Sequence, residues 1–274
     1  MQYKRGGAVA VAGLVAGVVA GATGCVGSGA VADDSPGQDP VGTLHRAADT
    51  LLAAGSSRAQ TSMEMATGGT RVTIRGEGVY DYRRQLGQLR VVLPQDPSGV
   101  SEHRPITELL APGALFMKNR GAGVPADKWV RVDTATLSDG NLVTGGATDP
   151  FAAAELLRGV RTATYVGESE VAGVGVRHYR GTVDLALAAR GATAGNRASL
   201  AAAAEGFATA EVPFDVYLDE QGRIRKVRHR FSFVNSGRRG VVAVASTVLL
   251  YDFGTPAVVT LPESRDIYAG RIAE

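Results

Sequence analysis

The side chains able to act as nucleophiles, acid–base groups or metal ligands are few and show no catalytic spacing. The four histidines lie in unrelated segments, without a metal-binding pattern such as HExxH. They are His45, His103, His178 and His229. The chain contains no GxSxG or SxxK motif, and its carboxylates are scattered. The Asp-Phe-Gly triplet at 252–254 and the glycine-rich stretch 121–126 match a kinase motif and a dinucleotide loop by chance. We therefore expect no enzyme, no metal site and no cofactor, although an active site assembled only in three dimensions stays open.

The single cysteine, Cys25, follows an export signal. Lys4 and Arg5 precede an unbroken run of small and apolar residues at 8–22, the pattern of a secretory signal peptide. The run is shorter than the roughly 20 residues of a spanning helix. The segment 22–25, Ala-Thr-Gly-Cys, then resembles the lipobox of bacterial lipoproteins, in which the cysteine is diacylated and becomes the N-terminus. The position three before the cysteine is usually Leu and here is Ala22.

Lipidation of Cys25 has one alternative, an ordinary cleaved signal peptide. That alternative would leave a lone free thiol in an oxidising compartment. Two acyl chains on one residue anchor a protein stably. We therefore expect residues 1–24 to be a lipoprotein signal peptide, and the diacylglyceryl cysteine to hold the protein on the outer face of the cytoplasmic membrane.

The charge balance limits the partners of the mature chain. The whole sequence has 29 Lys+Arg and 27 Asp+Glu, and loss of Lys4 and Arg5 leaves 27 of each, a formal net charge of zero. A neutral balance argues against a nucleic-acid partner, because nucleic acid selects a basic face.

With Cys25 acylated no thiol remains for a disulfide, so the fold must be stabilised by burial of apolar side chains alone. We expect a monomer.

Residues 25–40 are rich in Gly, Ser, Asp, Ala and Pro and predict a flexible tether. Residues 41–274 are expected to form a single domain. Helical spacing predicts a helix over 41–54 that ends at Gly55, a second over 151–158 behind Asp149-Pro150, and a third over 196–205. Strands are expected at 61–67, 71–75, 79–83, 88–93, 115–118, 128–133, 162–168, 174–184, 212–218, 224–233 and 241–253.

The last strands carry two further signals. The turn residues 219–222 join two of them, and a change of parity predicts a bulge beside Gly222. Segment 241–253 is apolar on both faces, so it is expected in the middle of the sheet with helices or a cavity over it.

Lys226, Arg228 and Arg230 alternate along the strand expected at 224–233 and so project from one face. They are interpreted as the solvated outer side of the sheet opposite Asp215, or alternatively as a contact for anionic lipid headgroups or a partner protein.

Several segments together resemble a known family. They resemble actinobacterial lipoproteins of the LppX/LprG type, structural relatives of the LolA and LolB lipoprotein carriers. The C-terminal segments that carry the resemblance are 214–224, 246–256, 259–262 and 267–268, and the earlier ones are 116–118, 128–133, 165–168, 173–179 and 183–184. The resemblance covers most of 60–268. It implies an α+β fold, a strongly curved antiparallel β-sheet or half-barrel with helices packed on the concave face. In relatives with known ligands, the space between sheet and helices holds acyl chains.

That resemblance gives two hypotheses. The first is a lipoprotein that binds or carries lipids in an apolar cleft between sheet and helices, a use that burial of acyl surface favours. The second is a tethered sensor or protein-interaction module with no lipid ligand. The first hypothesis requires an apolar hollow beneath the helices. If the same side chains pack as ordinary core, the lipid-carrier hypothesis fails and the protein is an anchored domain of unassigned role. The residues expected to line the hollow are Val72, Ile74, Leu93, Phe214, Val216, Phe231, Phe233, Val248 and Leu250.

Overall fold

The computed structural model describes residues 39–67, 70–94, 104–121, 123–235 and 240–270. The chain divides into two compact units, 1–37 and 38–274, and all of the described residues belong to the second. The predicted signal peptide, most of the predicted tether and the lipidation site Cys25 lie outside the described residues.

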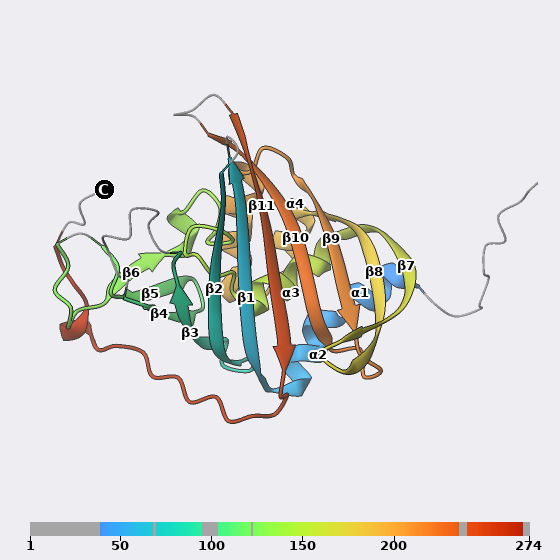
Figure 1. Ribbon diagram of the computed structural model, residues 1–274, viewed down its shortest axis with the longest axis horizontal. Helices are drawn as coiled ribbons and strands as arrows, with labels where there is room; N and C mark the ends of the chain where they lie inside the picture. The colour runs from blue at the N-terminus through green and yellow to red at the C-terminus, as the bar shows by residue number, and fades with distance from the viewer. Residues whose placement is uncertain (1–38, 68–69, 95–103, 122, 236–239, 271–274) are drawn as a thin grey trace, which may run out of the picture. The chain divides into compact units, whose positions relative to one another are not determined.

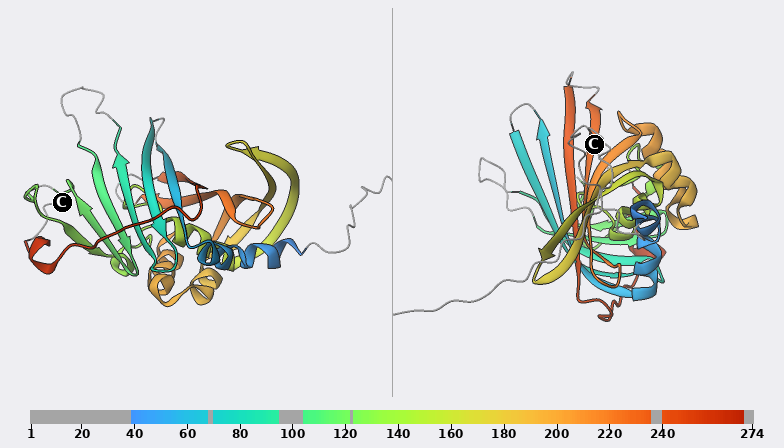
Figure 2. Two further views of the ribbon diagram at one scale, coloured as in Figure 1. Left: turned by 90° about the horizontal axis from the view of Figure 1, so that it is seen from below. Right: turned by 90° about the vertical axis from the view of Figure 1, so that its right-hand side faces the viewer.

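An eleven-stranded antiparallel sheet forms the body of the second unit, in the order β6-β5-β4-β3-β2-β1-β11-β10-β9-β8-β7. The sheet is strongly curved and stays open (Figures 1 and 2). Its strands are β1 (Ser56–Thr67), β2 (Thr70–Asp81), β3 (Leu86–Val92), β4 (Ile106–Ala111), β5 (Ala114–Lys118), β6 (Val130–Asp133), β7 (Val160–Val171), β8 (Val174–Asp184), β9 (Glu211–Leu218), β10 (Ile224–Asn235) and β11 (Gly240–Tyr251).

Helices cover one face of this sheet, as Figure 2 shows. They are α1 (Pro40–His45), α2 (Ala47–Ala54), α3 (Pro150–Leu156), α4 (Leu185–Gly191) and α5 (Ala194–Gly206), with short 3-10 turns at Thr134–Thr136, Leu157–Gly159 and Ser264–Asp266. The α+β half-barrel with helices on its concave face is thus confirmed. We call the face that carries the helices the inner face, and the opposite one the outer face.

Local signals placed most elements correctly. Asp149 caps α3 as predicted, because its carboxylate accepts from the backbone N–H groups of Phe151 at 2.7 Å and Ala152 at 3.0 Å. The bulge predicted beside Gly222 is confirmed by a register shift between Ile224 and Lys226.

Two predicted element boundaries were wrong, and two elements were missed. The helix over 41–54 is two helices that meet at Arg46. The expected strands 71–75 and 79–83 are one strand, β2, in which Gly78 is needed because a Cβ there would lie 1.9 Å from the carbonyl oxygen of Gln88. Strand β4 and helix α4 were not predicted.

The position of β11 agrees with its apolar sequence. It pairs with β1 and β10 in the middle of the sheet, as predicted. Its inner side chains, such as Val244 and Val248, are buried, whereas Leu249 on the outer face is half-buried and lines a pocket. Apolar residues on both faces of this strand thus have two different neighbours, the core and a groove.

The chain after β11 closes one end of the sheet. It passes over the outer face of β4 and β5, where Val259 packs with Leu109 and Phe116, and Ile267 forms a parallel bridge with Trp129 beside β6. This segment covers an otherwise exposed strand edge. Among the residues that the structure describes, no helix is both long and apolar enough to cross a membrane.

Candidate functional site

The inner-face residues expected to line a hollow are packed instead. Phe214 and Val216 are 0% exposed, Val248 is 1%, and Phe231 and Leu250 are 2%. A side chain that borders a void large enough for water retains accessible surface, so no such void adjoins Phe214, Val216, Phe231 or Val248, whereas Leu250 borders a pocket of the outer face. In this structure these side chains are packed as core, and their role as the lining of a ligand cleft stays a prediction.

The other predicted lining residues differ from one another in their exposure to solvent. Ile74 is 8% exposed and belongs to the same core cluster, and Val72 and Leu93 are half-buried against that cluster. Leu93 also lines a pocket that opens on the outer face. The side chain of Phe233 lies outside the described part. The predicted set is therefore brought together mainly as core, with Leu93 at the rim of a different site.

A glycine-rich loop at 137–149 covers the inner face where the helices do not. Its Gly146 lies against Ile74, and Ala147 comes close to Gly76, which has no side chain to hold it away. The hydroxyl groups of Thr148 and Ser246 are 2.5 Å apart, which links the end of the loop to β11. We call loop 137–149 together with α3, α4 and α5 the cover.

The space left between the cover and the sheet near this loop is small. A cavity of about 20 Å³ remains between β4, β5 and α5, bordered by Leu110, Thr134, Asn141 and Ser199 among others. It is large enough for one water molecule and far too small for an acyl chain.

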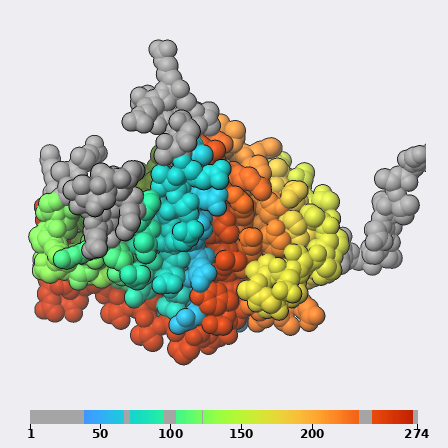
Figure 3. Space-filling view, in the orientation of Figure 1, coloured from blue at the N-terminus to red at the C-terminus, as the bar shows by residue number. Residues whose placement is uncertain are grey.

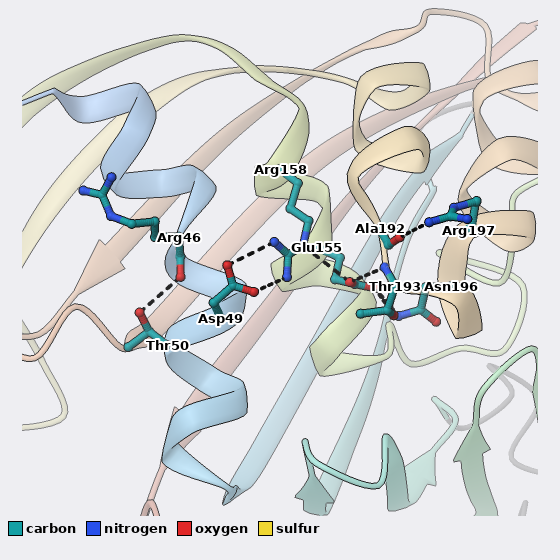
Figure 4. A network of polar contacts seen from close by, with 9 residues as sticks. All are labelled: Arg46, Asp49, Thr50, Glu155, Arg158, Ala192, Thr193, Asn196 and Arg197. Atoms are coloured by element: carbon teal, nitrogen blue, oxygen red, sulfur yellow. Dashed lines mark hydrogen bonds and ion pairs between the residues drawn. The ribbon is translucent and has the colours of Figure 1, made fainter.

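Polar contacts tie the helices to one another, as Figure 4 shows. The buried carboxylate of Glu155 in α3 accepts from the backbone N–H of Thr193 at 2.8 Å, from its hydroxyl at 3.1 Å and from the amide of Asn196 at 2.8 Å. Arg158 lies 3.5 Å from that carboxylate and binds Asp49 of α2 through two nitrogens, at 2.6 and 3.3 Å. Helices α2, α3 and α5 are thereby connected into one layer.

Two buried ionisable groups on the inner face have atoms without a hydrogen-bond partner within the described ranges, both carboxyl oxygens of Glu108 and Nε2 of His229. Burial, opposed only by Arg120, raises the pKa of Glu108 to about 8. Burial and, second, the charge of Arg230 lower the pKa of His229 to about 3. His229 is buried and lies between Phe214 and Phe231. Both groups are neutral near pH 7, as apolar surroundings require.

The outer face carries a compact charged cluster on β8, β9 and β10. Asp215 accepts from His178 at 2.8 Å, Arg180 at 2.8 Å and Arg230 at 2.6 Å. Burial alone would raise the pKa of Asp215, but these hydrogen bonds outweigh it and hold the pKa at about 2. Tyr217 stacks on His178 with ring centres 4.3 Å apart.

Lys226, Arg228 and Arg230 lie together on this outer face. Lys226 is 5.1 Å from the centre of the Tyr217 ring, Arg228 is 3.5 Å from Glu64, and Arg230 binds Asp215. Their charges are therefore partly neutralised by neighbours on the sheet, which weakens the attraction available for headgroups or a partner.

Asp215→Asn is expected to lower the free energy of unfolding at pH 7 by about 1 kcal/mol, a value reduced because the arginine partners are exposed. Since the pKa of Asp215 is depressed, its contribution is present above about pH 4 and disappears as the pH falls towards 2. Urea unfolding of both proteins along this range measures the difference. Asp252→Asn, at an exposed carboxylate, is the control, and an equal loss in both variants would contradict the expectation.

Two adjoining pockets lie on the outer face. One, of about 730 Å³, opens over β11, β1, β2 and β3, and a second, of about 580 Å³, lies between the β7–β8 turn and the end of β11. Gln60 and Leu249 border both, so the pockets adjoin. We call them together the outer groove. Sequence reasoning missed it, and its only signal was the apolar outer side of β11.

No His/Cys/Asp/Glu cluster able to hold a metal ion occurs among the described residues.

No protein-family profile matches the chain, and no curated protein is significantly similar to it in sequence. Solved structures do match. The lipoprotein LppX of Mycobacterium tuberculosis superposes with a TM-score of 0.50 at 10% identity, covering 81% of this chain and 100% of that one.

Two further structures are similar to a smaller degree. LprF from Mycobacterium bovis has a TM-score of 0.39 at 12% identity, covering 81% of this chain and 95% of LprF. A LolA superfamily protein from Nitrosomonas europaea has a TM-score of 0.35 at 11% identity, covering 77% and 93%. The inner face, its cover and the curved open sheet thus form the fold seen in the mycobacterial lipoprotein LppX.

Proposed function

We propose that this protein is a lipid-anchored extracytoplasmic lipoprotein that binds the acyl chains of lipids between the inner face of the sheet and the cover. Cys25 carries the anchor and holds the protein at the outer face of the cytoplasmic membrane. Because the interior is packed in the structure, binding requires the cover to separate from the sheet. The fold shared with LppX supports this proposal.

The observation that carries the proposal is the chemistry of the contact between cover and sheet. The sheet contributes large apolar side chains such as Phe214 and Val248, whereas the cover contributes many alanines beside a few larger residues. These larger residues are Leu142, Phe151, Leu156, Leu185 and Leu200. Those buried alanines are Ala147, Ala152, Ala153, Ala154, Ala188, Ala189 and Ala203. Each buried methylene is worth about 0.8 kcal/mol, so small side chains lose little on separation, and an acyl chain would bury the exposed sheet again.

A disulfide between cover and sheet tests this opening. Thr148→Cys with Ser246→Cys places two thiols where the hydroxyls are 2.5 Å apart, within reach of a bond. The full chain carrying Cys25→Ser would be used, so that no other thiol is present. We expect about tenfold less copurified lipid, measured by native mass spectrometry, in the oxidised protein than in the same protein after reduction.

The control disulfide joins Thr162→Cys and Thr182→Cys, whose hydroxyls are 3.0 Å apart between neighbouring strands β7 and β8 and which do not involve the cover. It should leave lipid content unchanged. Equal lipid in the locked and unlocked proteins, or no bound lipid in any of them, would contradict the proposal.

A second candidate is a tethered interaction module of the cell envelope without a lipid ligand. The packed inner face favours it, together with the outer-face position of Lys226, Arg228 and Arg230. A protein partner whose affinity falls in the triple glutamine variant of these residues, while no lipid copurifies with the wild-type protein, would select this candidate.

A further inference from the structure

The outer groove has an apolar end. The smaller pocket is bordered by Val171, Val174, Leu249 and Phe253, and Figure 3 shows the hairpin of β7 and β8, in yellow, lying over the front of the sheet beside β11. These residues come from two distant parts of the chain, 171–174 and 249–253. They form a wall of aliphatic and aromatic carbon on one side of the molecule.

The two arginines at this apolar end are balanced by two carboxylates, Asp219 and Asp252, the second of which borders the pocket. Asp219 accepts from Arg223 at 2.8 Å and from Arg225 at 3.0 Å, and both guanidinium groups lie over the Phe253 ring, at 4.6 and 5.0 Å. With Asp252 counted, the formal charge at this end is zero, so it suits a hydrocarbon chain more than an anion.

The other end of the groove differs in charge. Arg75 on β2 and Arg90 on β3 are exposed there, and neither forms an ion pair within 4 Å with any described residue. Among the described residues that border the pocket, Glu77, opposite Arg90 in the strand register, is the one carboxylate. Two guanidinium groups and one carboxylate leave a formal charge of +1 at this end. Guanidinium groups recognise carboxylate and phosphate through paired hydrogen bonds.

We propose that the outer groove binds a single-chain amphiphile with an anionic head, its acyl chain beside Leu249, Val174 and Phe253 and its head at Arg75 and Arg90. The pocket volumes of about 730 and 580 Å³ lie in the range of small-molecule sites. This site is separate from the inner face of the proposed function. The full thickness of the sheet lies between the two.

Titration calorimetry of the full chain carrying Cys25→Ser, with palmitate below its micelle concentration, tests the groove. Leu249→Glu puts a charge on the shared wall of both pockets and is expected to weaken palmitate binding about tenfold or more. Val166→Glu makes the same change at a 51% exposed residue that borders neither pocket and should leave the affinity unchanged. Equal losses in both variants would overturn the proposal.

Binding of the anionic head is tested by two substitutions of exposed arginines, which leave the core intact. Arg75→Gln with Arg90→Gln is expected to weaken palmitate and lysophosphatidylglycerol binding about tenfold and to leave zwitterionic lysophosphatidylcholine unaffected. The tighter of the two anionic ligands identifies a carboxylate or a phosphate head. Equal effects on all three ligands would remove the anion site and overturn the proposal.

The locked cover separates this inference from the proposed function. The oxidised Thr148→Cys/Ser246→Cys protein should still bind palmitate in the outer groove, whereas lipid held beneath the cover is lost. Palmitate binding that disappears in the locked protein and survives in Leu249→Glu would place the ligand on the inner face and overturn the outer site.

Discussion

Replacing Glu108 by glutamine is expected to stabilise the protein by about 3 kcal/mol more at pH 8.5 than at pH 5. In the folded chain burial keeps this carboxyl protonated up to about pH 8, whereas it ionises near its ordinary value of 4.5 in the unfolded chain. Between these values the folded state binds more protons than the unfolded state, so stability falls as the pH rises. Glutamine carries no ionisable proton and removes that slope.

Guanidinium unfolding at both pH values measures the Glu108 effect. Glu170→Gln, at an exposed carboxylate on β7, is the matched control and should change stability equally at the two pH values. A wild-type stability that does not decline between pH 5 and pH 8.5 would show that Glu108 has a partner or solvent contact in solution. The same result would weaken the view that this part of the inner face is dry.

The second large effect is expected at the centre of the cover. Glu155→Ala removes the acceptor of three hydrogen bonds and leaves the backbone N–H of Thr193, the amide of Asn196 and the guanidinium of Arg158 without their carboxylate. Such a loss at a fully buried site costs about 3 kcal/mol. For a domain of this size the midpoint of thermal unfolding should fall by roughly 10 °C.

Hydrogen exchange locates the Glu155 effect. Because the carboxylate joins α3 to the start of α5, amide protection should fall in both helices together and not in α3 alone. Glu205→Ala, at an exposed glutamate of α5, is the control and should be nearly neutral. Loss of protection confined to α3 would mean that the helices open separately, and the cover would not be one layer.

These two sites bear on function in different ways. A cover that opens as one unit exposes the whole inner face in one step, which suits entry of a long chain. Glu108 lies on that inner face and stays neutral near pH 7, so it presents no charge to an entering hydrocarbon. The outer groove needs no opening and offers its charged end to solvent at all times.

Local sequence determined most of the elements and the fold class. The cap at Asp149, the stop at Gly55 and the bulge after Gly222 follow from backbone chemistry within a few residues, and each lies where it was predicted. Alternation along β10 put Lys226, Arg228 and Arg230 on one face because side chains of a strand alternate. The prediction of two strands in place of β2 was wrong because the glycines there were interpreted as a turn. Gly78 instead allows the neighbouring strand to approach closely.

Only the tertiary structure decided whether the inner face is hollow or filled. The same apolar residues, such as Val216 and Leu250, predict a cavity wall or a packed core equally well, because apolarity does not specify what lies opposite. Loop 137–149 fills part of that space, and its small polar residues gave no sign of a buried position. The outer groove likewise depends on β2, β3 and the distant β7–β8 turn meeting across a curved sheet. Curvature arises from the pairing of all the strands, so no single segment encodes it.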